Sequence, residues 1–366
     1  MPVIEALARD CGTMGAMRKL GPWMVSGWLL GGFLVGSASK PNAFWKPQTS
    51  PTRASLRGVA AVSTRVAWAS GAQGTVLRTL DGGVHWRLIP APGDARLDFR
   101  AVSAFSALRA VLASSGLGPL SRIYTTGNGG RNWKLRFQGR DPDIFLDALA
   151  FSDPRHGLAL GDPIHGRFLL LRTRDGGAHW VALEHAPRAL PGEGAFAASN
   201  SCLQLRGRRE IWFASGGSVA RVFHSTDAGE TWSVVTPPIR QGSAAAGVFS
   251  LAFWRAQHGV VVGGDYQKPS DSNGTAAGSS DGGQRWTAAA QPPLGYRSAV
   301  AVLPHAGQFW LVAVGTSGTD ISRDDGQHWT PLGTTGYNSL GMIGPTGWAV
   351  GPDGRIALIT LPGSAK

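Results

Sequence analysis

Side chains that could hydrolyse a bond are sparse in this sequence. It contains 18 Asp, 5 Glu and 4 Tyr among 366 residues. Cleavage of a glycosidic bond requires two carboxyl groups placed across the bond, or a tyrosine nucleophile with a partner acid. Five of the aspartates belong to one recurring turn sequence, and Glu184, Glu193 and Glu210 are the glutamates outside that turn and the N-terminal leader. We therefore predict no catalytic residues.

Arginine is the second residue type that could form a functional site. The chain carries 29 Arg and 6 Lys, and its formal net charge is +12. Arg57, Arg100 and Arg297 lie at the start of three similar apolar segments. Guanidinium groups bind carboxylates through paired hydrogen bonds, so three of them around one opening would bind an acidic segment of a partner protein. The alternative is that they pair with acids such as Asp147 or are simply solvated.

Motifs for nucleic-acid, metal and nucleotide chemistry are missing from the sequence. There is no long basic run and no aromatic-rich RNA-binding signature, so nucleic acid is not a predicted partner. His156 and His165 flank Asp162 without metal-ligand spacing and are interpreted as loop histidines. No glycine-rich strand-turn-helix pattern indicates a dinucleotide. We predict no metal and no cofactor, and we interpret Cys202 as a small buried side chain.

The elements that must position these groups are predicted by one phrase, Ser/Thr-x-Asp-x-Gly-x-x-Trp, which occurs six times. Its hydroxyl and carboxylate can accept hydrogen bonds from nearby backbone N–H groups, and its glycine allows the positive φ of a tight hairpin. Successive tryptophans lie 47, 47, 52, 54 and 43 residues apart, which is typical of a four-stranded propeller blade. The Asp (or Asn) and Trp positions of the six copies are Asp81 and Trp86, Asn128 and Trp133, Asp175 and Trp180, Asp227 and Trp232, Asp281 and Trp286, and Asp324 and Trp329.

Seven inner strands are predicted, one more than the turns, at residues 56–62, 99–105, 145–151, 196–200, 249–253, 296–302 and 337–343. The seventh unit contains three strands before the chain ends. Residues 43–47 (AFWKP) resemble the segment after each turn and could supply the missing outer strand, which would remove an exposed edge. We predict an all-β fold, a seven-bladed β-propeller closed by an N-terminal strand, with six blades as the alternative. Residues 203–210 and 266–277 depart most from the repeat, and the second is expected to be a mobile surface loop.

The N-terminal residues do not belong to the repeat. Arg18 and Lys19 precede an apolar stretch, residues 20–36, and small residues follow it. We interpret residues 1–38 as a signal peptide, with an N-terminal membrane anchor as the alternative, and residues 39–366 as a single propeller domain. Met14 or Met17 is an alternative start. The protein is predicted to be exported to the periplasm or the extracellular space, and removal of the leader would leave Cys202 without a disulfide partner.

The repeated turns, together with residues 151–161 (FSDPRHGLALG) and 171–180 (LRTRDGGAHW), resemble the photosystem II stability and assembly factor family, whose Asp-box or BNR repeats also occur in exported bacterial propellers. The resemblance covers residues 43–360. It implies a monomeric, non-enzymatic scaffold that binds a membrane-protein or envelope-protein segment during assembly. The alternative is a sialidase-like or other glycoside hydrolase. Tyr296-Arg297-Ser298-Ala299 only partly matches the sialidase motif Phe/Tyr-Arg-Ile-Pro, and it lies in the wrong unit.

Overall fold

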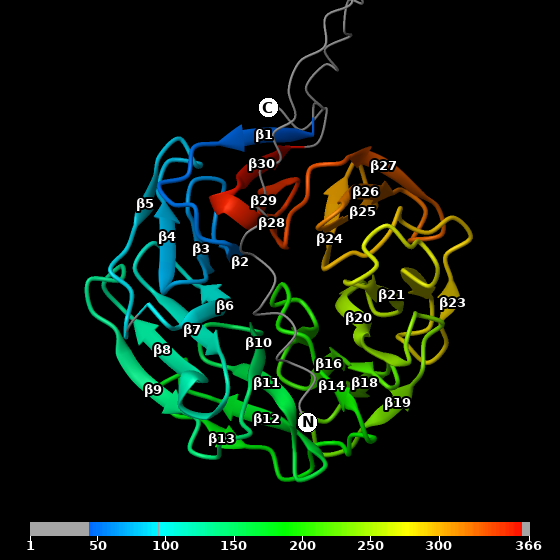
Figure 1. Ribbon diagram of the computed structural model, residues 1–366, viewed down its shortest axis with the longest axis horizontal. Helices are drawn as coiled ribbons and strands as arrows, with labels where there is room; N and C mark the ends of the chain where they lie inside the picture. Colours follow the sequence, from blue (N-terminus) through cyan, green and yellow to red (C-terminus); the bar gives the residue numbers. More distant parts are fainter. Residues whose placement is uncertain (1–43, 94, 361–366) are drawn as a thin grey trace, which may run out of the picture.

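Seven antiparallel sheets are arranged as blades around a common centre in the computed structural model, which describes residues 44–93 and 95–360 (Figure 1). The prediction of an all-β, seven-bladed propeller is confirmed, and the six-bladed alternative is wrong. The predicted leader, residues 1–38, lies outside the described residues. Within the described part of the chain, no helix is long and apolar enough to cross a membrane.

Blades 1 to 3 each consist of four strands that follow one another from the centre to the rim. Blade 1 contains β2 (Leu56–Ala61), β3 (Ala67–Gly71), β4 (Thr75–Thr79) and β5 (Trp86–Leu88). Blade 2 contains β6 (Asp98–Ala104), β7 (Ala110–Ser115), β8 (Arg122–Thr126) and β9 (Lys134–Gln138). Blade 3 contains β10 (Leu146–Phe151), β11 (Gly157–Ile164), β12 (Arg167–Thr173) and β13 (Val181–Ala182).

Blades 4 to 6 keep this order, and the fifth sheet is extended. Blade 4 contains β15 (Leu203–Arg206), β16 (Glu210–Ala214), β18 (Val222–Ser225) and β19 (Ser233–Val235). Blade 5 contains β20 (Ser243–Trp254), β21 (His258–Asp265), β22 (Ala276–Ser279) and β23 (Thr287–Ala288), to which β17 (Gly216–Gly217) and β14 (Glu193–Gly194) are added. Blade 6 contains β24 (Ala299–His305), β25 (Gln308–Gly315), β26 (Gly318–Ser322) and β27 (Trp329–Gly333).

Blade 7 joins the two ends of the described chain. It contains β28 (Ser339–Ile343), β29 (Thr346–Val350), β30 (Ile356–Thr360) and the N-terminal β1 (Trp45–Gln48), which pairs antiparallel with β30 (Figure 1). The predicted closure by residues 43–47 is therefore confirmed. Gln48 links this blade to blade 1, because its Oε1 accepts hydrogen bonds from the indoles of Trp348, at 3.0 Å, and Trp86, at 2.9 Å.

The six repeated turns share one hydrogen-bond pattern. In the first, Thr79 Oγ1 accepts a bond from Gly83 N at 2.8 Å, and Asp81 Oδ1 accepts one from His85 N at 2.9 Å. The second turn keeps the pattern with Asn128, whose Oδ1 accepts from Asn132 N at 3.0 Å. The amide oxygen thus replaces the carboxylate, as the sequence predicts.

Seven apolar clusters lie between adjacent blades and hold the ring together. The Trp of each repeated turn packs at the boundary with the preceding blade, as Trp133 does edge-on to Trp68 with ring centroids 6.2 Å apart. The boundary between blades 6 and 7 has no such turn, and Trp45 of β1 occupies this place beside Tyr337. Burying rings of this size stabilises each boundary by a few kcal/mol.

Three sequence predictions need correction. Residues 196–200 form no strand, and the inner strand of blade 4 is β15, which occupies part of the 203–210 segment that seemed to depart from the repeat. The 266–277 segment ends in β22, and the loop before it is tied down rather than free. Arg240 Nη1 bonds Asp271 Oδ2 at 2.5 Å, and Tyr296 N bonds the carbonyl of Pro269 at 3.1 Å.

Candidate functional site

Residues 195–201 cross the centre of the ring, and we call this segment the central plug. Its residues are buried, apart from Asn200 and Ser201, which are half-buried. Phe196 stacks on Phe249 of β20 with ring centroids 3.8 Å apart. Asn200 adopts a φ of +65°, a left-handed conformation that Asn tolerates better than most residues.

The central plug is bonded to blades all around it. Asn200 Oδ1 accepts from Leu149 N of blade 3 at 2.7 Å, and Ser199 Oγ donates to the carbonyl of Ser298, next to blade 6, at 2.6 Å. Ser339 of blade 7 donates to the carbonyl of Ser199 at 2.8 Å. The plug is thus tied to blades 3, 6 and 7 across the middle of the ring.

Arg57 and Arg100 lie together at one end of the inner strands, beside the central plug. Arg100 Nε donates to Asp98 Oδ2 at 2.7 Å, and its Nη1 reaches the carbonyl of Ala197 at 3.3 Å. Arg57 is partly exposed, yet its Nε is buried without a hydrogen-bond partner among the described residues. Burial lowers the pKa of Arg57 and the Arg100 charge lowers it further, whereas Asp98 and Tyr296 oppose the shift. The structure thus brings together two of the three arginines that the sequence analysis predicted to form a site.

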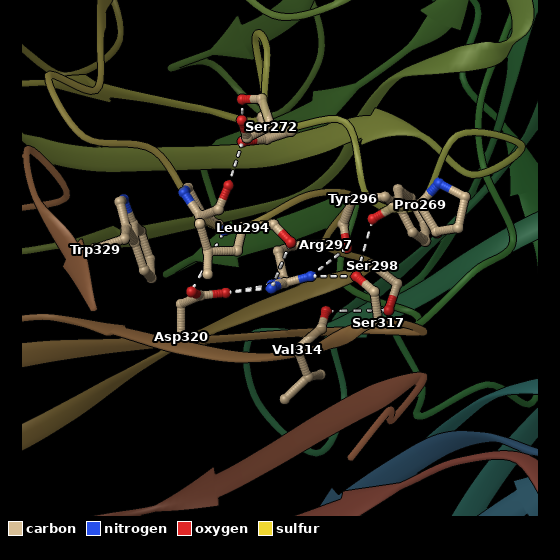
Figure 2. A network of polar contacts seen from close by, with 12 residues as sticks. Pro269, Ser272, Leu294, Tyr296, Arg297, Ser298, Val314, Ser317, Asp320 and Trp329 are labelled. Carbon is tan, nitrogen blue, oxygen red and sulfur yellow. Dashed lines mark hydrogen bonds and ion pairs between the residues drawn. The ribbon is translucent and has the colours of Figure 1, made fainter. Parts of the chain in front are cut away.

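Arg297 does not join them. It is 1% exposed, and its guanidinium forms a buried ion pair with Asp320 of β26, with Nε to Oδ2 at 2.6 Å (Figure 2). Its Nη1 also donates to Ser317 Oγ at 2.9 Å, and Ser317 in turn donates to the carbonyl of Pro269. Arg297 therefore holds the 266–275 loop against blade 6 and presents no charge to a ligand.

Two carboxyl groups, the buried Asp147 and the half-buried Asp162, form the other unusual feature of this face. Asp147 lies at a β-bulge of β10, is 1% exposed, and neither of its oxygens has a partner among the described residues. Burial raises its pKa well above the ordinary range, the charge of Asp162 raises it further, and Arg100 opposes the shift. Burial also raises the pKa of Asp162, to about 7, although Ala195 N donates to its Oδ1 at 3.0 Å.

A cavity of about 480 Å³ opens beside these carboxyls. Asp162, Glu193 and His165 line it. Glu193 is engaged, because it accepts hydrogen bonds from Ser215 Oγ at 2.5 Å and Arg221 Nε at 2.8 Å. Asp162 and the exposed Asp143 are therefore the carboxyls lining this cavity that form no ion pair among the described residues. The sequence analysis did not select Asp162 as a site residue. The available signal was an Asp near the end of β11, a strand that is otherwise mostly apolar.

The remaining candidate residues have structural surroundings. His165 is exposed, with Nε2 3.7 Å from Asp141 Oδ2, while His156 Nδ1 is 2.8 Å from Asp153 Oδ2. Across residues 44–93 and 95–360, no three His, Cys, Asp or Glu side chains are placed to hold a metal ion. Cys202 is fully buried, burial raises its thiol pKa, and its Sγ contacts the carbonyl of Phe196.

No family model matches this chain, and no curated protein matches it significantly. Its fold is similar to solved structures. One is YCF48 bound to a D1 peptide, with a TM-score of 0.60 and 16% identity over 88% of this chain and 99% of that one. YCF48 from Cyanidioschyzon merolae has a TM-score of 0.57 and 15% identity over 87% and 99% of the two chains. Virginiamycin B lyase from Staphylococcus aureus has a TM-score of 0.62 and 14% identity over the same shares. At these identities the likeness shows the propeller fold alone.

Proposed function

We propose that this protein is an exported, non-enzymatic propeller scaffold that binds an acidic segment of a membrane or envelope protein during assembly of a complex. The observation that carries the proposal is the Arg57 guanidinium. It is partly exposed beside Arg100, so the exposed part of the guanidinium can bind a carboxylate, and its buried Nε has no hydrogen-bond partner among the described residues. A propeller of similar fold, YCF48, has been solved with a bound D1 peptide, which supports this mode of binding. The resemblance to the photosystem II assembly factor family supports the same class of role.

The shape of the site restricts how a partner segment can bind: it would have to lie across the face of the ring on which Arg57 is found. The central plug closes the middle of the ring. A side chain or chain terminus of the partner would therefore reach Arg57 from the solvent side of that face and not through the ring. Arg100 already donates to Asp98, and it positions that acid next to Arg57. We therefore assign the direct contact to Arg57 and the supporting charge to Arg100.

A peptide-binding measurement tests this assignment. Fluorescence anisotropy would compare a panel of labelled acidic peptides with their Asn and Gln counterparts on the full chain. We expect Arg57→Glu to weaken binding of the acidic peptides at least tenfold, because a charge-assisted hydrogen bond becomes a repulsion. Arg65→Glu is the matched control, since Arg65 is exposed and lies past the far end of the same strand, β2. Equal binding by the acidic and amide peptides, or equal loss in both variants, would rule out this site.

A glycoside hydrolase is the second candidate, favoured by Asp162, which lines the 480 Å³ cavity and has a raised pKa. A general acid with a raised pKa is what glycoside cleavage needs. Turnover of fluorogenic glycosides, including a sialoside, that disappears in Asp162→Asn would support this function. Absence of turnover across the panel, together with binding of acidic peptides, would reject the hydrolase and support the scaffold proposal.

A further inference from the structure

A second cavity, of about 280 Å³, lies between blades 3 and 4 at the opposite ends of the inner strands from Arg57 and the buried carboxyls. Its walls come from the β10–β11 hairpin, the end of β12 and the β15–β16 hairpin, and it is lined by Arg172, Arg174 and Arg208 together with His156. The scaffold proposal makes no use of this cavity.

Positive charge at this cavity exceeds the carboxylates available to it. Glu210 lines the wall but is engaged through both oxygens by Arg206, with Nη2 to Oε1 at 2.9 Å. Asp153 is shared between His156 Nδ1, at 2.8 Å, and Arg208 Nε, at 3.9 Å.

Arg172 lies near the end of β12 and Arg174 directly follows the strand, and both line the cavity. Burial lowers the pKa of Arg172 and the Arg174 charge lowers it further, while Glu230 opposes the shift. Two guanidiniums therefore line the same cavity, and no carboxylate of the described residues is bonded to either.

The corresponding position between blades 1 and 2 shows how such an arginine can be satisfied within the fold. Arg78, like Arg172, directly precedes the hydroxyl residue of a repeated turn. Its Nη1 donates to the carbonyls of Ala107, at 2.6 Å, and Gly129, at 3.0 Å, and its guanidinium lies over the Trp68 ring. Arg172 instead makes one long bond, 3.3 Å to the carbonyl of Ala228. The donors of Arg172 are thus less fully used than those of Arg78.

The cavity also has an apolar floor. Leu158 is 2% exposed and Ile211 is 5% exposed, and Leu205 lines the wall beside them. We propose that this cavity binds a small organic anion, a phosphate monoester or a carboxylate, with its charged group against Arg172, Arg174 and Arg208 and its apolar body over Leu158 and Ile211. Bidentate contacts from guanidiniums suit both anions, and the volume suits a ligand of about the size of one substituted ring.

Isothermal titration calorimetry on the full chain tests the proposal with four probes: phenyl phosphate, benzoate, inorganic phosphate and phenol. We expect phenyl phosphate or benzoate to bind more tightly than inorganic phosphate, and phenol to show no binding. The stronger of the two organic anions identifies the class of ligand. Arg174→Gln and Arg208→Gln should each weaken binding about tenfold, the value of one charge-assisted hydrogen bond.

Arg131→Gln and Arg285→Gln are the matched controls. Both arginines are exposed in repeated turns of other blades, and each substitution removes one positive charge, as the test variants do. Equal loss in the control variants, or organic anions no tighter than inorganic phosphate, would overturn the proposal, since binding would then follow general surface charge. Thermal unfolding of each variant confirms that it is folded. Failure here would leave the peptide site untouched, because Arg57 lies at the other end of the blades.

Discussion

The rim and the centre of this propeller are built on different principles. Each repeated turn on the rim closes through bonds that span two to four residues, such as Gly83 N to Thr79 Oγ1. The central plug is bonded to residues far away in the chain: Ser339 donates to Ser199 across 140 positions, and Asn200 and Leu149 are 51 apart. The rim is repetitive and local, whereas the centre is unique and assembled from most of the chain.

The charged groups follow the same division. Carboxylates on the rim are half-buried or exposed and receive backbone hydrogen bonds, so the pKa of Asp81 is held below its usual range, chiefly by the His85 N–H. Carboxyls near the centre are buried or half-buried, and burial raises the pKa of Asp147 and Asp162. Rim acids therefore stabilise the fold when ionised, whereas central acids oppose it. This makes the centre the region where a ligand, a proton or a substitution has the larger effect.

The largest expected effect comes from breaking the Arg297–Asp320 pair. In Arg297→Met the fully buried Asp320 carboxyl loses its partner. Loss of one member of a buried pair costs about 3–5 kcal/mol. Urea unfolding at pH 7 should show a decrease of that size in the free energy of unfolding.

Arg57→Met is the comparison for that variant. Arg57 occupies the same place in its repeat but forms no ion pair with any residue that the structure describes, so its replacement should change the free energy of unfolding by less than about 1 kcal/mol. Adding Asp320→Leu to Arg297→Met should restore part of the loss, because the unpaired carboxyl is removed. Similar values for Arg57→Met and Arg297→Met would show that the two arginines play equivalent roles.

The second expected effect is a pH dependence of opposite sign at the centre and at the surface of the same blade. The Asp162 pKa is raised from 3.8 to about 7, so its stabilising contribution is complete below pH 3.8 and is lost as the pH rises through 7. The backbone N–H of Arg155 is the main cause that holds the Asp153 pKa down to about 2, so the contribution of Asp153 is present above pH 3.8 and is lost as the pH falls through 2.

Asn substitutions separate these two contributions. Relative to the natural protein, Asp162→Asn should gain stability as the pH rises from 5 to 8, because the cost of ionising a buried acid is gone. Asp153→Asn should be less stable at neutral pH, and the difference should shrink toward pH 2. Denaturant midpoints measured at pH 2, 5 and 8 provide the test. A flat difference between Asp162→Asn and the natural protein from pH 5 to 8 would contradict the assignment.

Sequence reasoning predicted the rim because the hydroxyl, the carboxylate, the glycine and the Trp of each turn are near neighbours in the chain. It also predicted that β1 would complete blade 7, since residues 43–47 repeat the pattern that follows each turn. It failed where spacing carries no information. Residues 196–200 have strand-like composition, but the left-handed Asn200 and partners from blades 3, 6 and 7 place them in the central plug.

Arg297 shows the same limit at a single residue. Arg57 and Arg100 lie within β2 and β6, whereas Arg297 precedes β24 by two residues. The three positions match in the sequence, yet the side chain of Arg297 turns to Asp320, an acid contributed by β26. Only the pairing of strands within blade 6 brings that acid within reach, and the repeat itself does not encode it.

The smallest expected effect is the coupling free energy between pairs of hydroxyl substitutions. It is also the most direct measure of the contrast between rim and centre. On the rim, Thr79→Val removes the acceptor of the Gly83 and Asp81 N–H groups, and Ser279→Ala removes that of the Gly283 and Asp281 N–H groups, each at a cost of about 1–2 kcal/mol. Because these turns lie in blades 1 and 5 and share no partner, the double variant should equal the sum to within about 0.5 kcal/mol.

In the centre, Ser199 and Ser250 are joined through Ser201, with Oγ to Oγ distances of 2.6 Å and 2.8 Å. Ser199→Ala and Ser250→Ala should therefore show a coupling above about 0.5 kcal/mol, because each removes a bond to the same hydroxyl. Urea unfolding of the two double-mutant cycles measures both couplings under the same conditions. Additive behaviour in the centre would mean that the plug is held by independent contacts, and the distinction between a local rim and a networked centre would not stand.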